Sequence, residues 1–125
     1  MARSHQTFDL EVSCKDMSAP ALATDLILCA ATRPEFRIER GDDENSPVVR
    51  FIIVRFTAEV IYGAEFYLDG NRLLAAFVTS PADWTSDKRA DAFARAFEPL
   101  FSLVVSKAGI GPTVQPASDE RPKKA

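Results

Sequence analysis

The sequence has few of the residues that build nucleophilic or metal sites. Its 125 residues include one histidine, His5, and two cysteines, Cys14 and Cys29. A histidine-dependent triad needs its base held beside the nucleophile, whereas His5 lies in a polar N-terminal segment. The cysteines lack the spacing of a redox pair or a zinc knuckle, and small buried apolar residues are the better interpretation. We therefore expect no metal, no cofactor and no histidine-based catalysis.

The chain also lacks long apolar runs and an excess of positive charge. No stretch approaches the ~18 uninterrupted apolar residues of a membrane span, because Arg50, Arg55 and Glu59 break the apolar run over 48–61. The N-terminus has no apolar segment typical of a secretory signal. A net charge of -3 gives little attraction to phosphate. These absences predict a cytoplasmic protein that neither enters a membrane nor binds nucleic acid.

The sequence does contain enough apolar residues to form one hydrophobic core. Hydrophobic residues make up 46% of the chain and charged residues 26%, as in soluble globular domains. A chain of this length can bury one core without disulfides or metals. We expect residues 1–111 to form a single α+β domain. Residues 112–125 are rich in proline, serine and charge, and they are expected to be a disordered C-terminal tail.

Periodicity predicts the first elements. Residues 7–14 and 35–40 alternate apolar and polar side chains, as half-buried strands do. Between them, Ser18 is a suitable N-cap for a helix over 19–32, and Pro34 ends that helix. The first part of the chain is therefore expected to be strand, helix, strand.

Residues 48–79 form an almost continuous β-rich block. The extended part over 48–68 is much longer than a usual strand of ~5–6 residues, so we expect a bend or bulge within 57–63. Gly63 is the expected pivot. Asp-Gly-Asn at 69–71 lies between apolar runs and predicts a tight β-hairpin turn.

An amphipathic helix is expected after this block, capped by Ser80, Thr85 or Ser86. Apolar residues over 93–105 recur at steps of three and four. Pro99 lies inside this pattern and predicts either a kink or a division into two helices. The order of elements predicts an α+β fold, with a curved antiparallel sheet of four to five strands and two helices packed on one face.

Two arginines, Arg50 and Arg55, interrupt apolar faces of the long strand. A charge in such a place either protects an exposed edge or pairs across strands with Glu39, Glu59 or Glu65. Cross-strand salt bridges are the structural interpretation. Contact with a partner protein is the functional one.

A second apolar surface is expected on the sheet face that the helices leave open. Phe36, Phe51 and Ile53 would form it, together with Phe66 or Tyr67. The competing explanation is that Phe8 or the helix kink packs against them. Trp84, in a loop before the long helix, is either an anchor for a partner or a hydrophobic staple. The predicted partner-binding residues are Phe36, Arg50, Phe51, Ile53, Arg55 and Trp84.

Carboxylates are the remaining candidates for acid–base chemistry. Asp42, Asp43 and Glu44 share one loop but lack the spacing and glycine of a calcium site, which favours a solvated turn. Glu59 and Glu65 flank the expected bend and could face a concave surface as acid or base. The predicted residues of a ligand pocket between the bent sheet and the long helix are Glu59, Tyr62, Glu65 and Tyr67.

These observations favour a non-enzymatic protein-binding or regulatory module, of the chaperone, immunity-protein or inhibitor class. It would act as a homodimer through its sheet and long helix. The alternative is a small-ligand or enzymatic pocket between sheet and helix, and a structural subunit of a larger particle is a third possibility. A likeness of fold class does not establish function.

Overall fold

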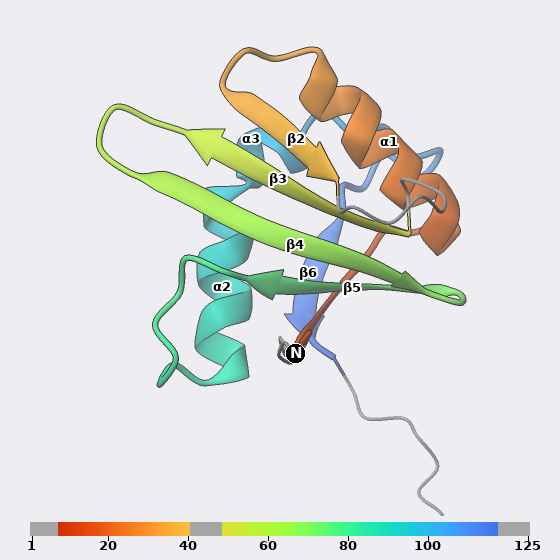
Figure 1. The fold of residues 1–125 in the computed structure, drawn as a ribbon. Coiled ribbons are helices and arrows are strands. Elements are labelled where there is room, and N and C mark those ends of the chain that lie inside the picture. The colour runs from red at the N-terminus through yellow and green to blue at the C-terminus, as the bar shows by residue number, and fades with distance from the viewer. Residues whose placement is uncertain (1–7, 41–48, 118–125) are drawn as a thin grey trace, which may run out of the picture.

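The computed structural model describes residues 8–40 and 49–117, which form one open antiparallel sheet with helices against it. The α+β prediction is confirmed, although the sheet has six strands instead of four to five. Their spatial order is β2-β3-β4-β5-β1-β6 (Figure 1). The elements are β1 (Leu10–Ser13), α1 (Ala19–Ala31), β2 (Phe36–Arg40), β3 (Arg50–Phe56), β4 (Ile61–Asp69), β5 (Arg72–Phe77), α2 (Ser86–Ala96), α3 (Glu98–Phe101) and β6 (Thr113–Pro116).

The β4–β5 hairpin forms where the Asp-Gly signal predicts it. Asp69 pairs with Arg72, and Gly70 at the turn has a φ of 63°. Glycine adopts this left-handed conformation without steric cost, which explains why the reversal falls at this point.

The expected bend within 57–63 is wrong, because the chain reverses completely there. β3 and β4 are antiparallel partners, with Phe56 opposite Ile61. The Thr57 hydroxyl donates to the Val60 carbonyl and accepts from the Val60 amide, which closes a turn without glycine or proline. Gly63 is no pivot, since it pairs with Val54 in a regular ladder. This reversal divides the expected long strand into two.

Side-chain caps set the starts of both longer helices. Ser18 accepts from the Ala21 amide at α1, and Thr85 accepts from the Lys88 amide at α2. Pro99 separates α2 from α3, because it supplies no backbone N–H to continue the first helix. The helical region ends at Phe101, earlier than expected. Within 8–40 and 49–117, no helix is long and apolar enough to cross a membrane.

The predicted disordered tail is wrong for residues 112–117. Residues Thr113–Pro116 form β6, which pairs with β1 and places Val114 opposite Val12. An edge strand needs little apolar surface of its own, because its partner strand supplies the hydrogen bonds and the core supplies the contact for Val114. The rest of the expected tail, 118–125, lies outside the described residues.

The core lies between one face of the sheet and the helices, and Figure 1 shows α2 behind β4 and β5. Residues expected on the open face are instead part of this core: Phe51 and Ile53 are 0% exposed and Phe36 is 7% exposed. The Phe36 ring stacks on Phe97, which lies between α2 and α3. The expectation that these three residues face a partner is therefore wrong. The pattern established that the strand has two apolar faces, but not which of them the helices cover.

Candidate functional site

The open face of the sheet carries side chains from the opposite strand positions. Ile52, Val54 and Phe56 of β3 are partly exposed there, beside Ile61 of β4. Val78 follows β5 and lies next to Gly63, since its amide donates to the Gly63 carbonyl. Ile61 is 57% exposed and Val78 58%. We call Ile52, Val54, Phe56, Ile61 and Val78 the apolar patch.

Ion pairs lie on the same face, both next to the apolar patch and farther along the strands. Arg50 Nε donates to Glu65 Oε2 at 2.8 Å across β3 and β4, as predicted for a cross-strand salt bridge. The ring of Tyr67 lies 5.6 Å from that of Phe8, and Arg50 lies over both rings. Two further pairs on this face are Arg37–Glu39 at 3.5 Å and Arg72–Glu11 at 3.4 Å.

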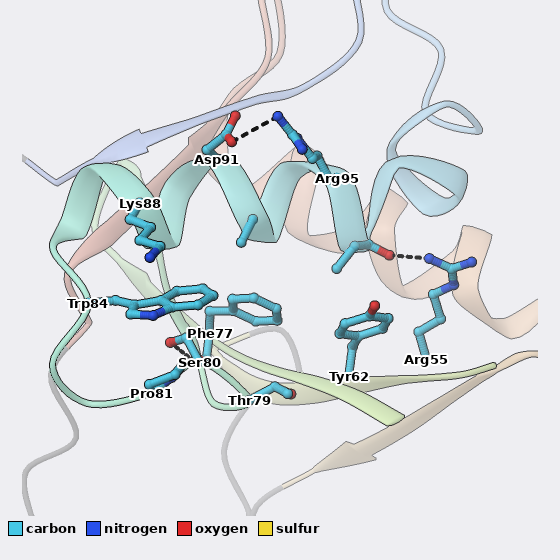
Figure 2. Close-up of a pocket in the computed structure, with 12 residues that line it drawn as sticks. Arg55, Tyr62, Phe77, Thr79, Ser80, Pro81, Trp84, Lys88, Asp91 and Arg95 are labelled. Atoms are coloured by element: carbon cyan, nitrogen blue, oxygen red, sulfur yellow. Dashed lines mark hydrogen bonds and ion pairs between the residues drawn. The ribbon is translucent and has the colours of Figure 1, made fainter. Parts of the chain in front are cut away.

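A cavity of about 480 Å³ lies behind the same end of the sheet, on the helix-covered side. It is bounded by α2, by the adjacent ends of β3, β4 and β5, and by the loop between β5 and α2 (Figure 2). This volume is within the range of small-molecule sites.

Three aromatic side chains line this cavity. Tyr62 of β4 and Phe77 of β5 lie with their ring centroids 6.2 Å apart. Trp84, in the loop, continues the aromatic wall, and the Lys88 ammonium lies 4.6 Å from its ring centroid (Figure 2). Trp84 is therefore held by a cation–π contact with the first turns of α2.

Arg55 lies at the other end of the cavity (Figure 2). One guanidinium nitrogen donates to the Ala96 carbonyl at 2.6 Å, at the end of α2 where the helix dipole favours a cation. Its Nε is buried and has no acceptor among the described residues. Six other arginines whose side chains are described have a carboxylate partner, whereas Arg55 has none in the described part of the chain.

The structure divides the predicted site residues between two faces of the sheet. Arg55, Trp84 and Tyr62 lie together in the cavity, although the sequence assigned them to two different sites. Glu65 and Tyr67 lie on the open face with Arg50, so they cannot line a pocket beneath the helix. Glu59 is exposed in the β3–β4 turn. His5, Asp42, Asp43 and Glu44 lie outside the described residues.

Sequence reasoning missed Phe77, Thr79 and Lys88 as lining residues of the cavity. In the sequence Phe77 has the pattern of an ordinary core residue of a strand. The alternation of a strand does not show that α2 leaves part of the Phe77 ring open to a cavity. Lys88 could have been found, since it lies four residues after Trp84 at the start of an expected helix.

Neither cysteine has the surroundings of a reactive thiol. Burial raises the pKa of Cys14 and of Cys29 above the ordinary value of 9.0. The Cys14 thiol donates to the Ile110 carbonyl and the Cys29 thiol to the Leu103 carbonyl. No group of three His, Cys, Asp or Glu side chains within the described ranges could hold a metal ion. The two thiols therefore act as packing groups of the core.

Both cysteines should react slowly with a thiol reagent while the protein is folded. At pH 8 we expect alkylation at least ~10-fold slower than in urea, because burial lowers the thiolate fraction and blocks access. Since both folded pKa values are raised, the stability that the protonated thiols contribute is present below pH 9 and is lost as pH rises above it. Mass spectrometry of the alkylated protein over pH 7–10 measures the rate at which the two thiols react. Equal rates in the folded and unfolded protein would contradict it.

Comparison of the chain with family models, with curated proteins and with solved structures finds no match.

Proposed function

We propose that this chain is a non-enzymatic, cytoplasmic protein-binding module that acts through the apolar patch on its open sheet face. The observation that carries the proposal is the exposure of Ile61 and Val78, at 57% and 58%, beside the partly exposed Phe56. Scattered exposed apolar residues are common, but a contiguous group on adjacent strands typically marks a contact surface.

The occupant that fits this patch is a second copy of the chain. A two-fold interface must match itself, so a patch with a strong charge of one sign would repel its copy. Here the neighbouring cations Arg37 and Arg50 each have a carboxylate partner on the same face. An apolar centre with neutralised charges around it is the usual arrangement of a protein interface.

The side chains near the cavity favour binding over catalysis. Its one carboxylate, Asp91, is exposed and lies 3.2 Å from Arg95, where it forms an ion pair on the surface of α2. A general base works best when it is held beside the substrate and away from competing charge. Asp91 is therefore poorly placed to act as a general base, and the lining favours binding.

Substitution of Val78 by lysine tests the proposed interface. We expect the wild type to have twice its 13.8 kDa chain mass at ~100 µM, and Val78→Lys to be monomeric. Burial of an unpaired ammonium in the interface should raise the dimer dissociation constant at least ~100-fold. Size-exclusion chromatography with light scattering over a concentration series measures both values.

Leu28→Lys is the matched control. Leu28 is also 58% exposed but lies on α1, away from the apolar patch, so this variant should dimerise like the wild type. A wild type that is monomeric at every concentration would exclude a second copy as the occupant. A Val78→Lys variant that stays dimeric would show that the interface lies elsewhere. Equal loss of dimer in both variants would show that the loss is not specific to the apolar patch.

A further inference from the structure

We infer that the cavity between α2 and the ends of β4 and β5 is a binding site for a small aromatic carboxylate. This inference does not depend on dimer formation, because the cavity and the apolar patch lie on opposite faces of the sheet. It follows from three properties of the lining: a wall of rings, an excess of positive charge, and one arginine without a counter-charge.

The wall of rings favours a flat apolar body. Tyr62 and Phe77 pack with an interplanar angle of 28°, and Trp84 lies beyond them in the loop (Figure 2). Aromatic rings prefer offset-stacked or edge-on partners at centroid distances of about 4.5–7 Å. A benzene-sized ring can take up this contact in a cavity of about 480 Å³ without a change in the core.

The charges favour a single anion. Arg55, Lys88 and Arg95 line the cavity, against one carboxylate, Asp91, which already pairs with Arg95. Lys88 has no carboxylate partner within the described residues, and Arg55 has none either. The cavity is thus locally cationic on a chain whose net charge is -3. A cationic or neutral polar ligand would leave these two charges uncompensated.

Arg55 is the group that would hold the carboxylate. It is only partly exposed, and its guanidinium is fixed by the bond to the Ala96 carbonyl. A partly buried cation gains most from an anion brought into the same low-dielectric space, and guanidinium–carboxylate bonds are charge-assisted. The Tyr62 hydroxyl lies on the same side of the cavity and can donate to the same anion (Figure 2).

Lys88 would add a weaker, more distant attraction. It lies eight residues before Ala96 on α2, which is about 12 Å along a helix axis. The Lys88 ammonium lies over Trp84 and Arg55 lies at the opposite end of the cavity (Figure 2), so the ligand's ring would lie towards Trp84 while its carboxylate faces Arg55. This spacing does not favour a phosphate, which is usually held by several donors at one point.

Trp84 is the single tryptophan of the chain, so its fluorescence reports the cavity directly. The probe is phenylacetate, and phenylacetamide is its neutral counterpart of the same shape. We expect phenylacetate to change the Trp84 emission saturably, with a dissociation constant on the order of 1 mM for a ligand of this size. The amide should bind at least ~10-fold more weakly, because it cannot form the charge-assisted bond.

Substitutions of single cationic residues test which side chain binds the carboxylate of phenylacetate. Arg55→Gln should weaken phenylacetate binding ~10-fold or more, and Arg55→Lys less. Lys88→Gln should weaken it ~2- to 3-fold, because an exposed charge is screened by solvent. Lys15→Gln, at an exposed site on a different loop, is the control and should bind like the wild type. Val78→Lys should also bind normally, which separates this site from the apolar patch.

Two measurements protect the test from misfolding and from nonspecific quenching. If Arg55→Gln does not fold, the Lys88→Gln variant and the salt dependence of wild-type binding test the role of charge. Only the binding of phenylacetate, and not that of phenylacetamide, should weaken as the sodium chloride concentration rises. A ligand-induced rise in melting temperature gives a readout that does not use Trp84. Equal binding of acid and amide, or no saturable change with the acid up to ~50 mM, well above the expected constant for a ligand of this size, would overturn the inference.

Discussion

Replacement of Phe93 by alanine should lower the free energy of unfolding by about 3–5 kcal/mol, because it leaves a cavity in the centre of the core. Phe93 is 0% exposed. Its ring centroid lies 5.1 to 6.0 Å from those of four other phenylalanines, which join α2 to β4, β5 and α3. These are Phe66, Phe77, Phe97 and Phe101. A loss of this size is a large part of the ~5–15 kcal/mol by which a typical domain is stable.

Urea unfolding followed by circular dichroism measures the effect. Phe56→Ala makes the same chemical change at a partly exposed position on the open face, and it should cost only about 1 kcal/mol. Phe93→Leu, which keeps more of the volume, should cost less than Phe93→Ala. Similar losses at positions 93 and 56 would show that the phenylalanine cluster is not the centre of the core.

Truncation after Gly111 should lower the free energy of unfolding by roughly 2–4 kcal/mol, because it removes β6. The deletion takes away the hydrogen bonds to β1 and the contact of Val114 with the core. It also exposes the edge of β1, whose Leu10 and Val12 are at most 1% exposed in the fold. A truly disordered tail would give no change.

A chain that ends at Ala117 is the control for this truncation, since it keeps β6 and the bond from the Ala117 amide to the Asp9 carbonyl. Two point variants separate packing from length. Val114→Asp places a charge against the core and should destabilise strongly, whereas Thr113→Asp, at an exposed position of the same strand, should be nearly neutral. Equal stability of the chains ending at 111 and 117 would contradict the role of β6.

Local signals in the sequence predicted the elements whose geometry depends on neighbouring residues. The Asp-Gly turn, the Ser18 cap and the break at Pro99 each act within a few residues, so their effects are readable from the chain. The turn at 57–60 was missed because Thr57 closes it with its side chain, and threonine is also common in strands.

The candidate site depended on contacts that no local pattern contains. Arg55 and Trp84 are 29 positions apart in sequence, and α2 brings them to one cavity only because it packs across β4 and β5. The Arg50–Glu65 pair could be anticipated, since the two lie on strands of one block. The contact of Arg55 with the Ala96 carbonyl could not, because it joins a strand to the end of a helix.

The amino-acid pattern by itself determined that this chain forms strands with two apolar faces and amphipathic helices, because alternation and helical periodicity are properties of neighbouring residues. Tertiary structure decided which face the helices cover, since either face of β3 is apolar enough to enter a core. It placed Phe51 and Ile53 inside and left Val54 and Phe56 towards the open side. It also turned residues 113–116 into an edge strand, because β1 offered them a row of hydrogen-bonding groups.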